Sequence, residues 1–154
     1  MKRKPNILDW IGKYIPGYVG YANRETRRQC DKVLRDHIAR QLANCESTLQ
    51  ERISALIKVH DLQAAQDLEI CRKRINTLSS KIKYAPYGES AFFSENQIKD
   101  DELDQLHECD KQILASVEDN MPRLPEMSTS DIQAFIATVL QCLDKRNQLL
   151  QEHK

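Results

Sequence analysis

Residues 34–57, LRDHIARQLANCESTLQERISALI, decide the fold class. Their apolar side chains recur in steps of four and three residues, the spacing that places them on one face of an α-helix. Neither Gly nor Pro occurs between Tyr21 and Ala85, a gap far longer than an ordinary globular helix needs. We therefore predict a long helix over residues 23–57. Its apolar stripe consists of Leu34, Ile38, Leu42, Cys45, Leu49, Ile53 and Leu56.

A mainly polar stretch, residues 58–61, interrupts this stripe. Asp61 can cap a second helix over residues 61–82, in which steps of four and three alternate as they do in antiparallel bundles. The two helices can form a hairpin or one continuous rod. A rod would leave a long apolar stripe uncovered in a chain of 154 residues, so the hairpin is the preferred prediction. The second stripe consists of Ala64, Leu68, Cys71, Ile75, Leu78 and Ile82.

Two further helices follow a loop that carries Phe92 and Phe93, which we expect to fold back onto the end of the bundle. The third helix is predicted over residues 96–120 and is ended by Pro122. A cluster of N-capping residues at 128–131 begins the fourth helix. The third stripe consists of Leu103, Leu106, Asp110, Ile113, Val117 and Met121, and the fourth of Ile132, Phe135, Ile136, Val139, Leu140, Leu143, Arg146 and Leu150.

The helix lengths suggest how these segments pack. At about 1.5 Å per residue, the last three helices would each be roughly 33–37 Å long and the first roughly 50 Å long. We predict an all-α fold, an up-down-up-down four-helix bundle with a long, overhanging first helix and a short N-terminal amphipathic segment. A single domain covers residues 1–154, with a basic and aromatic arm at 1–22 and the bundle at 23–152.

Composition excludes several protein classes. The chain is 30% charged and 40% hydrophobic with zero formal net charge, and no run approaches 18 apolar residues. These values argue against membrane-spanning, collagen-like and fully disordered proteins. Charged residues interrupt the apolar N-terminal residues, so no secretory signal forms. Five cysteines without a Cys-x-x-Cys pair suit neither a disulfide framework nor a zinc site, and we predict a cytoplasmic protein with reduced, mostly buried thiols.

Charge is unevenly spread along the chain. Residues 1–40 contain ten Lys or Arg against four Asp or Glu, whereas residues 95–131 contain three against eleven. The basic first helix and the acidic third helix can lie side by side and partly neutralise each other. Alternatively, the basic arm can meet an acidic partner, such as a protein or an anionic lipid surface.

The densest local pattern lies at residues 15–28, where two glycines and a proline shape a turn that leads into the first helix. Its tyrosines and arginines can stack or form hydrogen bonds, which would fix the turn to the helix. The same residue types anchor many protein interfaces, so a binding surface is the second interpretation. The candidate interaction residues are Tyr18, Tyr21, Arg24, Arg27 and Arg28.

Residues 16–31 read Pro-Gly-Tyr-x-Gly-Tyr-x-x-x-Glu-x-Arg-Arg-x-x-Asp. This opening resembles an uncharacterised family of small bacterial helical proteins, and the similarity continues at residues 82–88, 92–93 and 103–114. The resemblance implies a helical fold and a bacterial origin, but no activity. Three residues depart from the family pattern and are expected to fill space, namely Cys30, His107 and Cys109.

Asp110 lies on the apolar stripe of the third helix. Burying a carboxylate is costly unless it finds a donor or an opposite charge, so we predict a buried ion pair. The candidate partners are Arg27, Arg28, Arg74 and Arg146.

Metal, cofactor and catalytic signatures do not stand out. A di-iron bundle needs two Glu-x-x-His pairs and two more carboxylates, whereas this chain offers only Asp104-x-x-His107. Phosphate-binding glycine motifs and the nucleophile elbow are also missing from the sequence. We therefore predict no cofactor, no metal and no enzymatic activity.

The segment at residues 7–15 is short and amphipathic and contains Trp10, the single tryptophan. It can cap the end of the bundle, or it can anchor the protein at a membrane surface whose headgroups attract the basic arm.

These observations lead to a functional prediction. We expect a non-enzymatic interaction or scaffold module that binds a protein partner through the basic N-terminal turn and the first helix. The alternative is a peripheral membrane protein that uses the Trp10 segment and the basic arm at the inner face of the membrane. Self-association through an uncovered end of the first helix is a further option, and the acidic third helix argues against nucleic acid.

Overall fold

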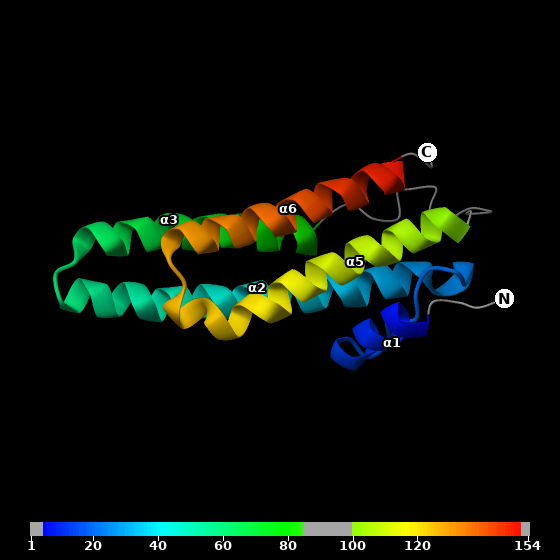
Figure 1. Ribbon diagram of the computed structural model, residues 1–154, viewed down its shortest axis with the longest axis horizontal. Helices are drawn as coiled ribbons and strands as arrows, with labels where there is room; N and C mark the ends of the chain where they lie inside the picture. The colour runs from blue at the N-terminus through cyan, green and yellow to red at the C-terminus, as the bar shows by residue number, and fades with distance from the viewer. Residues whose placement is uncertain (1–4, 85–99, 152–154) are drawn as a thin grey trace.

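The computed structural model describes residues 5–84 and 100–151, and within them every regular element is a helix (Figure 1). The all-α prediction is thus confirmed, with five α-helices packed together in the described part of the chain. The residues expected at the start of the third helix, 96–99, and the loop residues Phe92 and Phe93 lie outside the described residues. In order the elements are α1 (Pro5–Tyr14), η1 (Arg24–Thr26), α2 (Arg27–Lys58), α3 (Leu62–Lys83), α5 (Asp100–Asn120), η2 (Met121–Glu126) and α6 (Thr129–Gln151).

The first two long helices form the expected hairpin. The chain reverses between α2 and α3 at residues 59–61, and the two helices contact each other along their lengths (Figure 1). His60 adopts a left-handed conformation with φ of 62°. Asp61 caps α3 as predicted, because its Oδ1 accepts a hydrogen bond from the amide of Ala64 at 3.3 Å.

The second pair consists of α5 and α6, joined by the 3-10 helix η2. Arg52 of α2 donates from Nη1 to the carbonyl oxygens of Leu124 and Met127, both at 2.9 Å. These bonds attach the connection to the first hairpin. The two pairs also meet directly, because α3 contacts α6 and α2 contacts α5 (Figure 1).

The predicted stripes form the core. Each of the four long helices turns its stripe inward, although some predicted residues are only partly buried, namely Leu56, Ala64, Leu103, Met121, Leu140 and Leu150. At the start of α3 the buried alanine is Ala65 rather than the predicted Ala64. The buried stripe residues of α2 and α3 are Leu34, Ile38, Leu42, Cys45, Leu49, Ile53, Leu68, Cys71, Ile75, Leu78 and Ile82.

The overhang of the long helix differs from the expectation. The N-terminal part of α2 extends beyond α3, but α5 runs along it (Figure 1). The stripe residue Leu34 is buried there, and so is Cys30 one turn earlier. The stripe expected to drive self-association is therefore covered. The hairpin tip carries one group of exposed apolar residues, in which Ile57, Val59 and Leu62 are 50%, 70% and 62% exposed.

The N-terminal amphipathic segment is α1, and it contacts α5. Ile11 and Ile15 are buried, and Trp10 is partly buried against the core with its ring 5.1 Å from that of Tyr14. Crossing a membrane would need a longer apolar run than any helix within residues 5–84 and 100–151 provides.

The hairpin turn yields a stability prediction. A left-handed conformation costs a residue with a Cβ about 1–2 kcal/mol, a cost that glycine does not carry. His60→Gly should therefore raise the free energy of unfolding, by about 1 kcal/mol, in urea titrations at a pH where histidine is neutral. Lys58→Gly, in the last turn of α2, is the matched control and should lower it. A loss of stability in His60→Gly would contradict this turn geometry.

Candidate functional site

The glycine-rich turn before α2 passes close to α5. Gly17 and Gly20 have φ values of 95° and 83°, which only glycine adopts readily. A Cβ at Gly20 would lie 2.9 Å from Nε2 of His107 and 3.1 Å from Cδ2 of Leu8. The second glycine therefore allows the turn to lie directly against α5.

Two tyrosines fix this turn to a single carboxylate. The hydroxyls of Tyr18 and Tyr21 both donate to Oδ2 of Asp110, at 2.8 Å and 2.6 Å. Both tyrosines are buried, and their rings meet edge to face with centroids 5.9 Å apart. The geometry matches the interpretation in which the motif fixes the turn, but the tyrosines fix it to α5 and not, as expected, to the first long helix.

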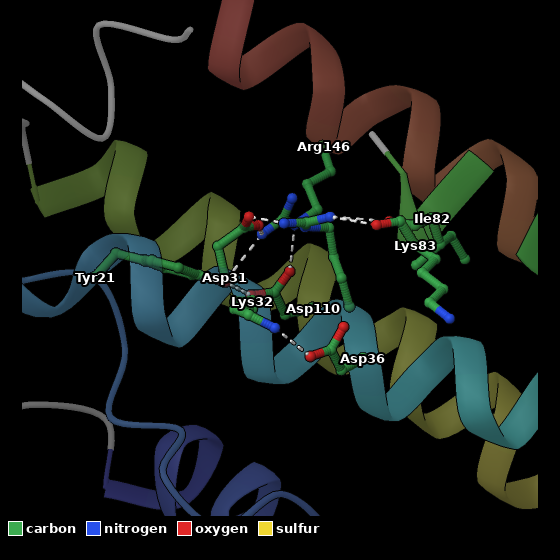
Figure 2. Close-up of polar contacts among 9 residues, drawn as sticks. Tyr21, Asp31, Lys32, Asp36, Ile82, Lys83, Asp110 and Arg146 are labelled. Carbon is green, nitrogen blue, oxygen red and sulfur yellow. Dashed lines mark hydrogen bonds and ion pairs between the residues drawn. The ribbon is translucent and has the colours of Figure 1, made fainter. Parts of the chain in front are cut away.

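Arg146 of α6 occupies the other side of Asp110 (Figure 2). Its Nε donates to Oδ1 of Asp110 at 2.7 Å, and its Nη2 donates to Oδ1 of Asp31 at 2.6 Å and to the hydroxyl of Tyr21 at 2.9 Å. One guanidinium therefore joins α6 to α5, to α2 and to the N-terminal turn. The predicted burial of Asp110 in an ion pair is observed, with Arg146 as its partner.

Arg35 of α2 extends these contacts to α3, at Ile82 and Lys83. Its Nε donates to Oδ2 of Asp31 at 2.8 Å, and its Nη1 donates to the carbonyl oxygens of Ile82 and Lys83 at 3.2 Å and 3.0 Å. The positively charged guanidinium of Arg35 thus caps the C-terminal end of α3. We call the connected set the polar cluster; it consists of Tyr18, Tyr21, Asp31, Arg35, Asp110 and Arg146.

Burial and charge fix the protonation states within the polar cluster. Burial, together with the negative charge of Asp110, raises the pKa of Tyr18 and of Tyr21 well above the usual 10. Burial alone would lower the pKa of Arg146. The interactions of the guanidinium with Asp110, Tyr21 and Asp31 outweigh this effect of burial, so the pKa of Arg146 is raised. The tyrosines therefore stay hydrogen-bond donors, and the arginine stays cationic. Among the described residues, no buried side-chain nitrogen or oxygen lacks a hydrogen-bond partner.

His107 does more than fill space, which corrects the expectation from the sequence. Its Nε2 accepts a hydrogen bond from the backbone amide of Tyr21 at 3.1 Å, and its ring stacks on that of Tyr21 with centroids 5.5 Å apart. Burial lowers the pKa of His107, although Asp110 and Asp104 oppose this shift. The imidazole is therefore neutral, with its proton on Nδ1.

The cysteines are all unpaired, and four of the five are buried. Burial raises the pKa of Cys30 to about 11 and that of Cys45 to about 12, and it also raises those of Cys71, Cys109 and Cys142. Protonated thiols are poor nucleophiles and poor metal ligands. Within the described ranges, no group of three or more His, Cys, Asp or Glu side chains is placed to hold a metal ion.

The structure divides the candidate interaction residues. Tyr18, Tyr21 and Arg27 are buried, and Arg27 donates from Nε to the carbonyl oxygen of Tyr21 at 2.7 Å. Arg28 is exposed, Arg24 belongs to η1, and Trp10 lies partly buried on α1. The structure therefore does not bring these residues together on one surface.

Sequence reasoning missed Asp31 and Arg35 as members of the cluster. A signal was present, because counting back from Leu34 and Ile38 in helical steps places both residues on the buried stripe of α2.

Comparison of the chain with protein-family models, with curated proteins and with solved structures finds no match. The resemblance of residues 16–31 to a bacterial family therefore stays a prediction. What the site does has to be argued from its own geometry.

Removing one charge from the polar cluster should lower the stability of the protein strongly. Asp110→Asn leaves Arg146 without one of its two carboxylates in a buried setting, so we expect the free energy of unfolding to fall by about 3–5 kcal/mol in urea titrations. Asp36→Asn is the matched control, because Asp36 pairs with Lys32 at the exposed surface and should cost less than about 0.5 kcal/mol. Equal losses in the two variants would contradict the assigned role of Asp110.

The lowered pKa of His107 predicts a pH dependence. Folding favours the neutral ring, so its contribution to stability is complete above the usual pKa of about 6.5 and is lost as the pH falls through that value towards the lower pKa of the folded state. Between about pH 7.5 and pH 5, the stability of His107→Gln should fall less steeply than that of the wild type. A His107→Gln profile parallel to that of the wild type would contradict this role of His107.

Proposed function

We propose that the chain is a non-enzymatic helical interaction module that binds a protein partner through its N-terminal turn and α2. In this proposal α2, α3, α5 and α6 form an up-down-up-down four-helix bundle that acts as a rigid support. The contacts of α2 with α3 and α5, and of α6 with α3 and α5, support a bundle built from two helical hairpins, α2 with α3 and α5 with α6, that pack on each other.

The observation that carries the proposal is that every carboxylate oxygen of the polar cluster is hydrogen-bonded within the protein. The carboxylate oxygens of Asp110 and of Asp31 all accept hydrogen bonds from within the protein. A turn held by such bonds presents its outer side in one shape, and a preformed surface loses less conformational freedom on binding. Tyr18 and Tyr21 thus act as positioning residues behind the surface.

Exposed residues of types that suit a protein partner occur at the end of α1, in the turn and at the start of α2. Tyr14 and Val19 are exposed, and Lys13 and Arg28 add positive charge. Aromatic and arginine side chains are enriched at protein interfaces. The proposal therefore places the partner on these exposed residues rather than on the buried tyrosines.

The membrane alternative uses α1 and the basic arm. Ile11 is buried and Trp10 is partly buried, on a helix that contacts α5. Inserting these side chains into a bilayer would require them to leave the core, with loss of buried apolar contacts. This cost favours a protein partner over a membrane surface. Affinity capture from separated cytosol and membranes distinguishes the protein partner from the membrane alternative.

The test is affinity capture of the tagged protein from nuclease-treated lysate separated into cytosol and membranes. Arg28→Glu should abolish recovery of a stoichiometric partner that the wild type captures. An acidic residue suits the first turn of α2, so we expect this variant to fold, and a lower melting temperature would report the loss of the contacts that Arg28 makes. Lys145→Glu, an equal change of charge at an exposed position of α6, should capture the partner normally.

Melting temperatures from circular dichroism accompany each variant. Capture of the same partner by Arg28→Glu would move the binding surface away from the turn. If the tagged protein is recovered with membranes and no stoichiometric protein accompanies it, the membrane alternative replaces the proposal.

A further inference from the structure

A groove of about 230 Å³ lies between α3 and α6. Its floor is apolar and consists of Leu78 of α3 with Ile136 and Leu140 of α6. Its rim is cationic and comes from one helix, with Lys73, Arg74 and Lys81 of α3. This groove is built from different helices than the N-terminal turn and α2, so its role is independent of the function proposed for that turn.

The rim residues form no direct ion pair within the described part of the protein, although Lys73 lies close enough to Glu69 to help lower the pKa of that carboxyl. No ion pair joins Lys73, Arg74 or Lys81 to a carboxylate there. Arg74 donates instead to the side-chain oxygen of Gln133, a neutral acceptor. Glu69, one turn before Lys73, is held by Arg72 at 2.7 Å. Three positive charges thus border one edge of the groove and attract an anionic partner.

The size of the groove limits what can enter it. Pockets for drug-sized ligands and cofactors usually enclose about 300–1,000 Å³, which is more than this groove offers. One or two apolar side chains of a partner fit the space better, as anchor residues do at protein interfaces. The floor residues Leu78 and Ile136 are only 3% and 2% exposed, so a group must insert between the helices to reach them. A flat lipid surface would not do this.

We propose that the groove between α3 and α6 docks an acidic amphipathic helix. An apolar side chain of that helix enters over Leu78 and Ile136, and its carboxylates pair with the cationic rim. Lys73 and Lys81 are eight residues apart, or about 12 Å along α3, which matches acidic residues two turns apart on a partner helix.

The probe is a fluorescently labelled, designed amphipathic helix in which Glu residues flank a row of Leu and Phe. Its counterpart carries Lys in place of every Glu. Fluorescence anisotropy with the full chain should show binding of the acidic helix alone, weakening as salt is added. The double variant Lys73→Glu/Lys81→Glu should weaken that binding at least about tenfold, whereas Lys58→Glu/Lys145→Glu, with an equal change of charge at exposed lysines elsewhere, should change it less than about twofold.

A second variant separates the groove from its charge. Thr77 is exposed and lines the groove, so Thr77→Trp fills the space without changing the charge and should also weaken binding at least about tenfold. Circular dichroism verifies that each variant is folded.

Three results would overturn the proposal. The first is equal weakening by the two double variants, since binding would then reflect overall charge. The second is unchanged binding by Thr77→Trp, since the groove would then not be entered. The third is absence of helix binding together with sedimentation on anionic vesicles that Lys73→Glu/Lys81→Glu abolishes, which would assign the patch to a lipid surface.

Discussion

The interaction on which the structure depends is the bridge from Arg146 to Asp110 and Asp31. A buried guanidinium loses its hydration, and it is tolerated only where carboxylates and hydroxyls replace that water with good geometry. Here Arg146 meets Asp110 of α5, Asp31 of α2 and the hydroxyl of Tyr21, all within 2.9 Å. A shift of α6 by one turn would break all three bonds. The bridge therefore fixes the register of α6 against α5 and against α2. Apolar contacts specify such a register less strictly.

The two ends of the molecule are consequently held by different means. At the end that carries the N-terminal turn, Arg35 ties the last carbonyls of α3 to α2, and the polar cluster defines how the helices align. Toward the hairpin tip the core is apolar, with Leu49, Ile53 and Leu124 buried and Arg52 holding the carbonyls of η2 and the residue after it. Directional bonds give one end a single geometry, while less directional packing closes the other.

The sequence was sufficient for the helices and for part of the polar cluster. Apolar residues at helical spacing predicted the stripes, and Asp110 and Arg146 were recognisable because each interrupts such a stripe. The tyrosines could not be placed in the same way. Tyr18 lies 92 residues from Asp110 in the chain, and no local spacing predicts that the turn packs on α5. Tyrosine and arginine also serve in buried networks and in interfaces alike, so residue type alone left both interpretations open.

The same bonds that hold the turn also limit its chemistry. The phenols of Tyr18 and Tyr21 and the thiol of Cys30 have raised pKa values because they are buried, so they remain protonated near neutral pH. Arg146 remains charged, and the hydroxyls continue to donate to Asp110. His107 differs, because its pKa is lowered from 6.5 and protonation would turn the acceptor of the Tyr21 amide into a second donor. The turn is thus held by groups whose charge is constant near neutral pH and by one neutral imidazole, so its geometry near neutral pH depends on a single group that titrates in the acidic range.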